Sequence, residues 1–469
     1  MDILDWSATA LAGAVARGTL HPREVIQQAL RRIEAVNGRL QALIDVDGDD
    51  ALGQADAVAQ RLQAGELLPL AGVPFSVKDN LWVGGRRSTF GSRLFAGHVA
   101  PRDAWAVARL RQAGAVVVGI SNCSEFACRG VTVNPLHGTT LNPLDTARTT
   151  GGSSGGAVAS VAAGMAALAL ATDAGGSIRR PAAHTGLVGL KPTFGRVPHP
   201  WGFADPSAEI SVVGPIARCV DDVALALSLL TGHDGRDLYS APGQLTDALA
   251  RPLRLAYSPQ LGCDFAVDAD VAAAVERGAV AAERLGHSVV VADPVWPQGT
   301  GEYPLLELQQ AALASLFGAR WRIEPELFDP DLGTQIEAGF AVGGPRIAQL
   351  LRLREELAHA LGEFFSRYDL LLTPTVPCEP WLVDRSAPAV IGGGAVGPRA
   401  HAAFTPLFNY CGVPALSLPC GVGARGLPVG LQIIGPRWHD ERVLGLARQL
   451  ETVLPHRVRA PSGVVGLRP

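Results

Sequence analysis

Short apolar runs alternate with amphipathic stretches along most of this 469-residue chain. Apolar residues at helical spacing predict helices in residues 9–64, 103–113, 155–163, 221–230, 269–285, 305–317, 346–365 and 440–453. Two-residue alternation or unbroken apolar runs predict strands in residues 73–77, 115–119, 167–171, 253–257, 288–291, 369–373, 414–418 and 429–434. Strands that alternate with helices indicate an α/β architecture. The three glycines at residues 392–394 predict a mobile loop.

Two glycine-rich turns containing serine stand out from this pattern. They are Thr150-Gly151-Gly152-Ser153-Ser154-Gly155-Gly156 and Asp173-Ala174-Gly175-Gly176-Ser177-Ile178-Arg179. Turns of this kind serve as plain connectors, as phosphate cradles, or as mounts for a nucleophile with an oxyanion hole. The Gly-x-x-x-x-Gly-Lys-Ser/Thr pattern of a phosphate loop is missing, which disfavours the second alternative. Ser153 and Ser154 are expected to cap the helix that follows them.

Composition narrows the classes of function. A net charge of −4 argues against attraction to nucleic acid or to an anionic membrane, and the longest apolar run is too short to span a bilayer. The seven cysteines form no Cys-x-x-Cys pair, so a disulfide or zinc framework is not expected. The acidic N-terminus does not resemble a signal peptide. We therefore expect a soluble cytoplasmic protein without a metal site.

Only two lysines, Lys78 and Lys191, occur among 40 basic residues. Arginine stays protonated, so a site that needs a neutral amine can only use lysine. Lys78 lies at the end of the strand predicted at residues 73–77, next to Asp79. Lys191 precedes a proline in an extended segment and is expected to be structural or on the surface.

The two serine turns resemble those of the amidase signature family. The likeness extends to Gly72-Val73-Pro74-Phe75-Ser76-Val77-Lys78-Asp79, to Gly189-Leu190-Lys191-Pro192-Thr193 and to Gly430-Leu431-Gln432-Ile433-Ile434-Gly435. It covers nearly the whole chain and is loosest in the middle third. The fold it implies is a single large α/β domain with a central mixed β-sheet flanked by helices on both faces.

The resemblance implies a Ser–cis-Ser–Lys triad without a cofactor. Ser177 would be the nucleophile, Ser153 the proton relay after a cis bond to Gly152, and Lys78 the base. Backbone N–H groups of Ala174, Gly175, Gly176 and Ser177 would hold the oxyanion. Supporting roles would fall to Thr150, Gly152, Ser154, Asp173 and Arg179. Such a lysine must be neutral to accept a proton, which burial favours.

On this resemblance we divide residues 1–469 into four parts of one amidase signature domain. Residues 1–65 form an N-terminal helical layer and residues 66–235 the catalytic core. Residues 236–400 form a variable substrate-side region, and residues 401–469 complete the core sheet. The implied reaction is hydrolysis of a small carboxylic amide through an acyl-enzyme. A homodimer is expected from the resemblance only.

Two alternatives remain open. One is the glutaminase component of a tRNA-dependent amidotransferase, its A subunit, which holds the glutamine carboxylate with an arginine and its amine with an aspartate. Those positions align near Gln335 and Ala402, which supply neither charge, and Arg180 replaces a glutamine usual in that protein. The other is a silent binding relative. A substrate pocket lined by Trp201, Phe203, Trp321 and Phe404 would favour an aromatic or aliphatic amide.

Overall fold

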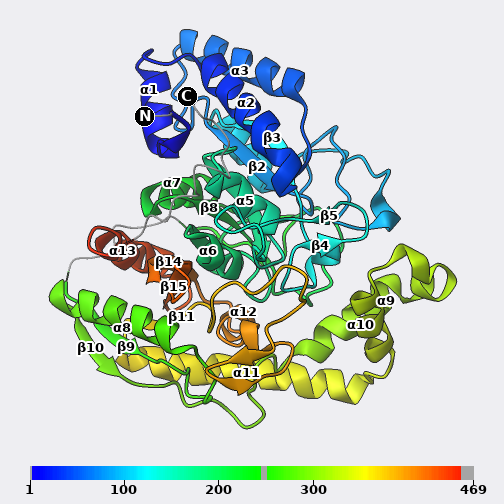
Figure 1. The fold of residues 1–469 in the computed structure, drawn as a ribbon, viewed down its shortest axis with the longest axis vertical. Coiled ribbons are helices and arrows are strands. Elements are labelled where there is room, and N and C mark those ends of the chain that lie inside the picture. Colours follow the sequence, from blue (N-terminus) through cyan, green and yellow to red (C-terminus); the bar gives the residue numbers. More distant parts are fainter. Residues whose placement is uncertain (1–2, 244–250, 456–469) are drawn as a thin grey trace.

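The apolar runs of the sequence form one eleven-stranded sheet in the computed structural model, which describes residues 3–243 and 251–455. The strand order is β1-β3-β2-β6-β8-β7-β14-β15-β11-β9-β10. The sheet is mixed, because β2 runs parallel to β3 and β6 whereas β7, β8, β14 and β15 pair antiparallel. Figure 1 shows it running from the N-terminal helices down to β10.

The first half of the sheet contains the strand that ends at Lys78 and the strand that lies between the two serine turns. Its members are β1 (Leu43–Asp45), β2 (Pro74–Lys78), β3 (Val116–Ser121), β6 (Leu168–Asp173), β7 (Val188–Lys191) and β8 (Val212–Ala217). Neighbouring parallel strands end at the same edge of a sheet. Lys78 at the end of β2 therefore lies beside Thr172 and Asp173 at the end of β6.

The second half comes from the later part of the chain. Its members are β9 (Arg254–Tyr257), β10 (Ser288–Val291), β11 (Leu370–Pro374), β14 (Ala415–Val422) and β15 (Pro428–Ile434). Strands β9 and β10 are parallel, and β9 is also parallel to β11. Two short hairpins lie outside this sheet: β4 (Val133–Asn134) with β5 (Gly138–Thr139), and β12 (Val390–Ile391) with β13 (Gly394–Ala395).

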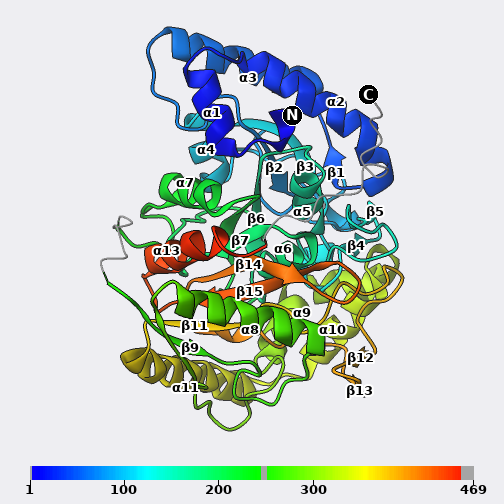
Figure 2. The ribbon, with the colours of Figure 1, turned by 60° about the vertical axis from the view of Figure 1, so that its left-hand side comes forward.

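Helices cover both faces of the sheet. They are α1 (Ala8–Ala16), α2 (Pro22–Leu40), α3 (Gly48–Gln63), α4 (Trp105–Gln112), α5 (Gly155–Ala162), α6 (Arg179–Thr185), α7 (Val220–Leu230), α8 (Ala269–Arg284), α9 (Leu306–Ile323), α10 (Pro330–Phe340), α11 (Gly344–Arg367), α12 (Pro406–Tyr410) and α13 (Asp440–Glu451). Successive strand residues face opposite sides. On β15, Gly430 faces Ala183 of α6 and Leu431 faces Gly278 of α8, so α6 and α8 lie on opposite faces. Figure 2 shows α8 and α13 in front of β14 and β15.

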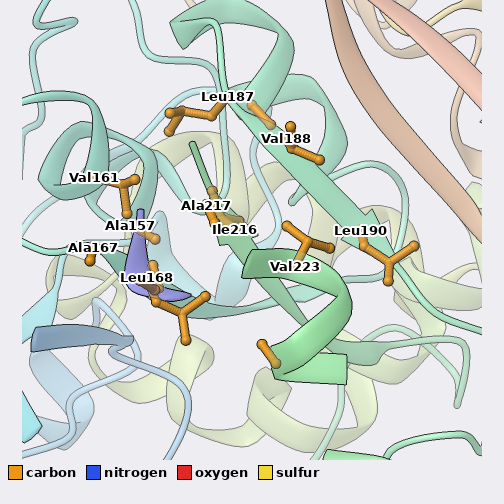
Figure 3. Packing of buried hydrophobic residues seen from close by; sticks show 14 of the residues in the cluster. Ala157, Val161, Ala167, Leu168, Leu187, Val188, Leu190, Ile216, Ala217 and Val223 are labelled. Atoms are coloured by element: carbon orange, nitrogen blue, oxygen red, sulfur yellow. The ribbon is translucent and has the colours of Figure 1, made fainter. Parts of the chain in front are cut away.

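The main core joins the helices to both halves of the sheet. Figure 3 shows Val223 of α7 beside Leu190 of β7, and Ala157 and Val161 of α5 near Leu168 of β6. A separate aromatic cluster joins α9 and α10 to loops that follow β2 and β3. In it, Phe126 stacks on Phe317 with ring centroids 4.0 Å apart. This cluster holds α9 and α10 against the end of the sheet where β2 terminates.

Several sequence predictions need correction. The expected helical layer of residues 1–65 also contains β1, which joins the sheet next to β3. Strand β8 and helix α10 were not predicted. The glycines at 392–394, expected to form a mobile loop, form the turn and first residue of the β12–β13 hairpin. Lys191 is fully buried, which excludes a surface position. In the described part of the chain, every helix is too short or too polar to cross a lipid bilayer.

Candidate active site

Lys78 and Thr172 meet where β2 and β6 end. The Lys78 side chain is fully buried, and its Nζ donates hydrogen bonds to Ser153 Oγ at 2.8 Å and to Thr172 Oγ1 at 2.9 Å. Thr172 Oγ1 also accepts a bond from Asn80 Nδ2 at 2.9 Å. Two rigid strand ends thus fix the amine against the hydroxyl of Ser153.

Burial lowers the pKa of Lys78 to about 8. Loss of hydration disfavours the ammonium form, and the nearby Cys123, Asp173 and Cys128 only partly oppose this effect. A free lysine titrates near 10.4. The Lys78 amine is therefore far closer to neutrality at physiological pH than an exposed lysine, which suits a proton acceptor.

The turn that carries Ser153 has space only for glycine at positions 152 and 155. The peptide bond between Gly152 and Ser153 is cis, as the resemblance implied. A Cβ on Gly152 would lie 2.7 Å from backbone atoms of Val131, and one on Gly155 would lie 2.1 Å from Thr150 Oγ1. Backbone of Val131 and the Thr150 hydroxyl fill the space that side chains would need.

Ser154 does not cap α5 with its side chain, which corrects the sequence prediction. Its hydroxyl donates instead to the carbonyl of Thr172 at 3.4 Å, and the first amide of α5, that of Gly155, donates to Thr132 Oγ1 at 2.8 Å. Thr150 Oγ1 donates to the Gly151 carbonyl at 3.1 Å. Ser154 thereby ties the serine turn to β6, next to Lys78.

Ser177 follows β6 and opens toward a cleft. It is 6% exposed and lines the cleft together with Ala174 and Gly175. Within residues 3–243 and 251–455, its hydroxyl makes no hydrogen bond, either to Ser153 or to another group. The structure therefore contains the lysine-to-serine contact of the predicted triad, and the contact between the two serine hydroxyls is not formed.

The N–H of Gly176 is already used. It donates to Asp173 Oδ1 at 2.7 Å, and Gly176 does not line the cleft. This occupied N–H argues against Gly176 as an oxyanion donor. Among the described residues, the N–H groups of Ala174, Gly175 and Ser177 have no hydrogen-bond acceptor.

Asp173 and Arg179 brace this loop from beneath. They form an ion pair at 2.9 Å, and both side chains are fully buried. Burial alone would raise the pKa of Asp173, but the Arg179 guanidinium and Asn409 hold it well below its usual value. Arg179 also donates to Gln432 Oε1 at 2.7 Å, so the loop is tied to β15.

The aromatic residues expected in the pocket lie elsewhere. Trp201, Phe203, Trp321 and Phe404 are absent from the lining of the cleft. Phe203 stacks on Phe90 and Trp321 packs on Phe328, whereas Phe404 is buried against Phe265. The Trp201 indole lies under Arg236. The aromatic side chains that do line the cleft are Phe90, Phe126 and Tyr303.

The cleft has an empty volume of about 580 Å³, part of it open to solvent, and it carries charges that the sequence alignment missed. Its lining includes Arg129, Arg180, Arg399 and Asp205. Ala402 lines it as well, whereas Gln335 only touches its wall by accepting a bond from Arg399 at 3.2 Å. The cleft is therefore charged, although Gln335 and Ala402, the positions aligned to the glutamine-binding residues of the amidotransferase A subunit, are neutral.

Thr172, Asn80 and Thr132 were not predicted as site residues. Thr172 could have been found as the polar residue that ends an apolar strand run directly before Asp173. Asn80 lies two residues after Lys78 and lines the cleft. Thr132 gives no comparable signal, since it lies in a loop with no glycine-serine turn of its own. Within the described residues, no cluster of three or more His, Cys, Asp or Glu side chains is placed to hold a metal ion.

Comparison with known proteins identifies the family of the chain. The family model described as Amidase matches residues 24–444. The A subunit of the glutamyl-tRNA(Gln) amidotransferase of Deinococcus radiodurans is 36% identical, over 97% of this chain and 99% of that protein. The structure of a bacterial aryl acylamidase superposes with a TM-score of 0.88 at 29% identity, over 99% of both chains.

The structure of 6-aminohexanoate cyclic dimer hydrolase is similar as well. It superposes with a TM-score of 0.86 at 29% identity, over 98% of this chain and 99% of that one. These relatives share one fold but differ in the amides that their names record. Because the family model spans most of the chain and the whole fold superposes closely on that of a family member, the chain belongs to the amidase signature family of amide hydrolases.

Proposed function

We propose that this protein hydrolyses a linear carboxylic amide through an acyl-enzyme on Ser177, with Ser153 as relay and Lys78 as base. The observation that carries the proposal is the buried Lys78 amine, 2.8 Å from Ser153 Oγ, beneath a cleft that Ser177 lines. A solvent-exposed lysine would have argued against it. All three residues come from motifs that the family resemblance assigns to the reaction.

In the first half-reaction, Ser177 Oγ attacks the amide carbonyl carbon. Its proton passes to Ser153 Oγ, and the Ser153 proton passes to the neutral amine of Lys78. When the tetrahedral intermediate collapses, the carbon–nitrogen bond breaks and the proton returns through Ser153 to the leaving nitrogen. The products are an ester on Ser177 and free amine or ammonia. For this relay the Ser177 hydroxyl must turn toward Ser153 when substrate binds.

In the second half-reaction, water attacks the ester and gives its proton to Lys78 along the same route. The proton returns to Ser177 as the acid leaves. The unoccupied N–H groups of Ala174, Gly175 and Ser177 are suited to hold the oxyanion in both halves. Removing one such donor typically slows a reaction by about 10²- to 10³-fold.

A glutaminase component of an amidotransferase is the second candidate. The relative from Deinococcus radiodurans carries that enzyme's name, and the cleft offers both the guanidinium groups and a carboxylate, Asp205, that a free amino acid would need. Glutamine hydrolysis, and a stable complex on coexpression with B and C subunits, would favour this candidate over a stand-alone amidase. The cytoplasmic location remains a prediction from the sequence, and the homodimer remains an expectation from the family resemblance.

The direct test is covalent labelling of Ser177 with a fluorophosphonate. The wild-type chain should gain one adduct, located at Ser177 by peptide mass spectrometry, and Ser177→Ala should gain none. A screen of small aliphatic, aryl and dipeptide amides for amine release then tests turnover. Labelling at another residue, or undiminished turnover by Ser177→Ala, would contradict the proposal.

A further inference from the structure

Arg180 is a buried cation without an anionic partner. Its side chain belongs to a residue only 6% exposed, yet no carboxylate of the described residues lies within ion-pair distance. Nη2 makes one long hydrogen bond, 3.4 Å, to the Gly152 carbonyl, and Nε has no partner in residues 3–243 and 251–455. Buried guanidinium groups are normally paired, so this one has unused donor capacity.

Arg180 lies directly beside the nucleophile loop. It is the second residue of α6, and it lines the same cleft as Ser177. A Cβ on Gly176 would lie 3.1 Å from Arg180 Nε, which places the guanidinium against the residue before Ser177. A substrate whose anionic group binds Arg180 would therefore have only a few bonds between that group and the carbonyl carbon that Ser177 attacks.

A second guanidinium lines the same cleft. Arg399 lies 5.1 Å from the centre of the Tyr303 ring, and its Nη2 donates to the neutral Gln335 at 3.2 Å. In the described part of the chain Arg399 forms no ion pair either. The Tyr303 hydroxyl in turn lies over Gly175, where an added Cβ would approach it to 2.2 Å. Two cations and a hydroxyl thus line the same cleft as Ser177.

Nearby acidic groups do not neutralise these cations. Asp173 pairs with Arg179, and the exposed Asp205 accepts hydrogen bonds from the backbone and hydroxyl of Ser207. The third arginine of the cleft, Arg129, is already paired with Asp329 and Asp331.

His401 adds no charge, because burial and the neighbouring Arg180 hold its pKa well below the usual value. Among the described charged residues that line the cleft, Arg180 and Arg399 are therefore the cations without an anionic partner, and Asp205, the carboxylate of the lining, accepts hydrogen bonds from Ser207 and pairs with neither of them.

We propose that Arg180 and Arg399 form a carboxylate subsite, so that the substrate is a short amide with a carboxylate close to the scissile bond. This inference rests on the proposed hydrolysis at Ser177 and names its substrate class. A guanidinium donates two parallel hydrogen bonds to a carboxylate, a geometry that a neutral amide group cannot match. The cleft thereby selects by charge as well as by size.

The test compares each acid with a neutral amide of the same skeleton. Succinamic and glutaramic acids carry a carboxylate, whereas succinamide and glutaramide do not. The kcat/KM for ammonia release should be about 10- to 100-fold higher for the better of the two acids than for its diamide, as expected of a charge-assisted hydrogen bond. Arg180→Gln should remove this preference through KM, while the diamide changes less than about threefold.

Arg129→Gln is the matched control, since Arg129 lines the same cleft but is already paired. It should leave the acid-to-diamide ratio unchanged, and Arg180→Lys should restore part of it. Equal turnover of acid and diamide by the wild type, or an Arg180→Gln variant that loses both substrates equally, would overturn the subsite.

Binding separates this subsite from the catalytic proposal. Calorimetry with succinate and glutarate on Ser177→Ala needs no turnover, and Arg180→Gln in that background should abolish the binding of whichever diacid is held. If fluorophosphonate labels Ser177 but neither diacid binds, the subsite is wrong and the hydrolase proposal stands. If a diacid binds through Arg180 but Ser177 is never labelled, the subsite stands and the catalytic proposal fails.

Discussion

The only two lysines of the chain lie at similar positions, each at the end of a buried strand, but their amines have different hydrogen-bond partners. Lys78 ends β2, Lys191 ends β7, and both are fully buried. Burial lowers the pKa of Lys78 to about 8, and burial with the nearby Arg179 lowers that of Lys191 to about 7. Yet Lys78 Nζ bonds to the hydroxyls of Ser153 and Thr172, whereas Lys191 Nζ donates to the Pro192 carbonyl at 2.9 Å.

A lowered pKa alone therefore does not identify a base. Lys191 has the lower pKa, but a backbone carbonyl has no proton to give it. Lys78 faces a hydroxyl next to the cleft, so a proton can reach it. Perturbed pKa values mark candidates for function, and contact with an exchangeable proton selects among them.

The largest expected effect comes from replacing each of the two lysines by methionine. Lys78→Met should reduce kcat/KM by about 10³- to 10⁵-fold, as loss of a triad member does in serine hydrolases. Lys191→Met should change it by less than about tenfold, because the Lys191 amine donates to a backbone carbonyl and Lys191 does not line the cleft. Amide turnover and fluorophosphonate labelling rates of both variants measure this. Comparable losses in two well-folded variants would mean that Lys191 also takes part.

The pH dependence of the wild type tests the role of the neutral amine. Only the unprotonated form accepts a proton, so kcat/KM should fall about tenfold for each unit below the Lys78 pKa of about 8 and level off above it. Stopped assays from pH 5 to 10 give the profile. A profile that is flat from pH 6 to 9 would contradict a lysine base.

Thr172→Val tests how much the hydrogen bonds of Lys78 matter, because it removes one of the two hydroxyl groups that accept a hydrogen bond from Lys78 Nζ. The variant should lose about tenfold in kcat/KM, in line with one hydrogen bond. Thr172 Oγ1 accepts from the ammonium and stabilises it, so the acid limb of the pH profile should also move to lower pH. If activity falls but the acid limb of the pH profile does not move, the role of Thr172 would be to hold Asn80 through its hydrogen bond.

The smallest effect concerns stability. A lysine of the unfolded chain keeps its proton up to about pH 10.4, whereas folded Lys191 releases it near pH 7. The unfolded state binds more protons in this window, so stability should rise with pH from about 7 to 10 and fall as the pH drops toward 7. Urea unfolding at several pH values should show a shallower rise for Lys191→Met. Lys78 adds a rise of the same sign above about pH 8.

Parts of this arrangement were accessible from the sequence and others were not. Period-two alternation at residues 73–77 and the glycine turns marked Lys78, Ser153 and Ser177, because local pattern determines strand ends and tight turns. Strand β8 was missed because its Val212-Val213-Gly214-Pro215-Ile216-Ala217 contains glycine and proline, which usually argue against a strand. Helix α10 was missed because its polar face and two glycines weaken the apolar period.

The cleft walls were the least predictable part. Phe203 and Trp321 were predicted to line the pocket because they are aromatic, but they pack against the aromatic cluster that contains residues of α9. Arg399 and Tyr303 reach the site only through long-range packing of loops far apart in sequence. No local pattern reports on such contacts, and alignment to Gln335 and Ala402 consequently overlooked the charges that line the cleft.

The origin of the cleft lining has a consequence for how this enzyme can diversify. Its floor comes from the ends of β2 and β6 and from turns in which glycine is sterically required, so that part resists replacement. Another part of its wall comes from Tyr303, Gln309 and Arg399, which lie outside the sheet strands. New substrate preferences can therefore arise by exchange of that wall while the reacting groups remain untouched.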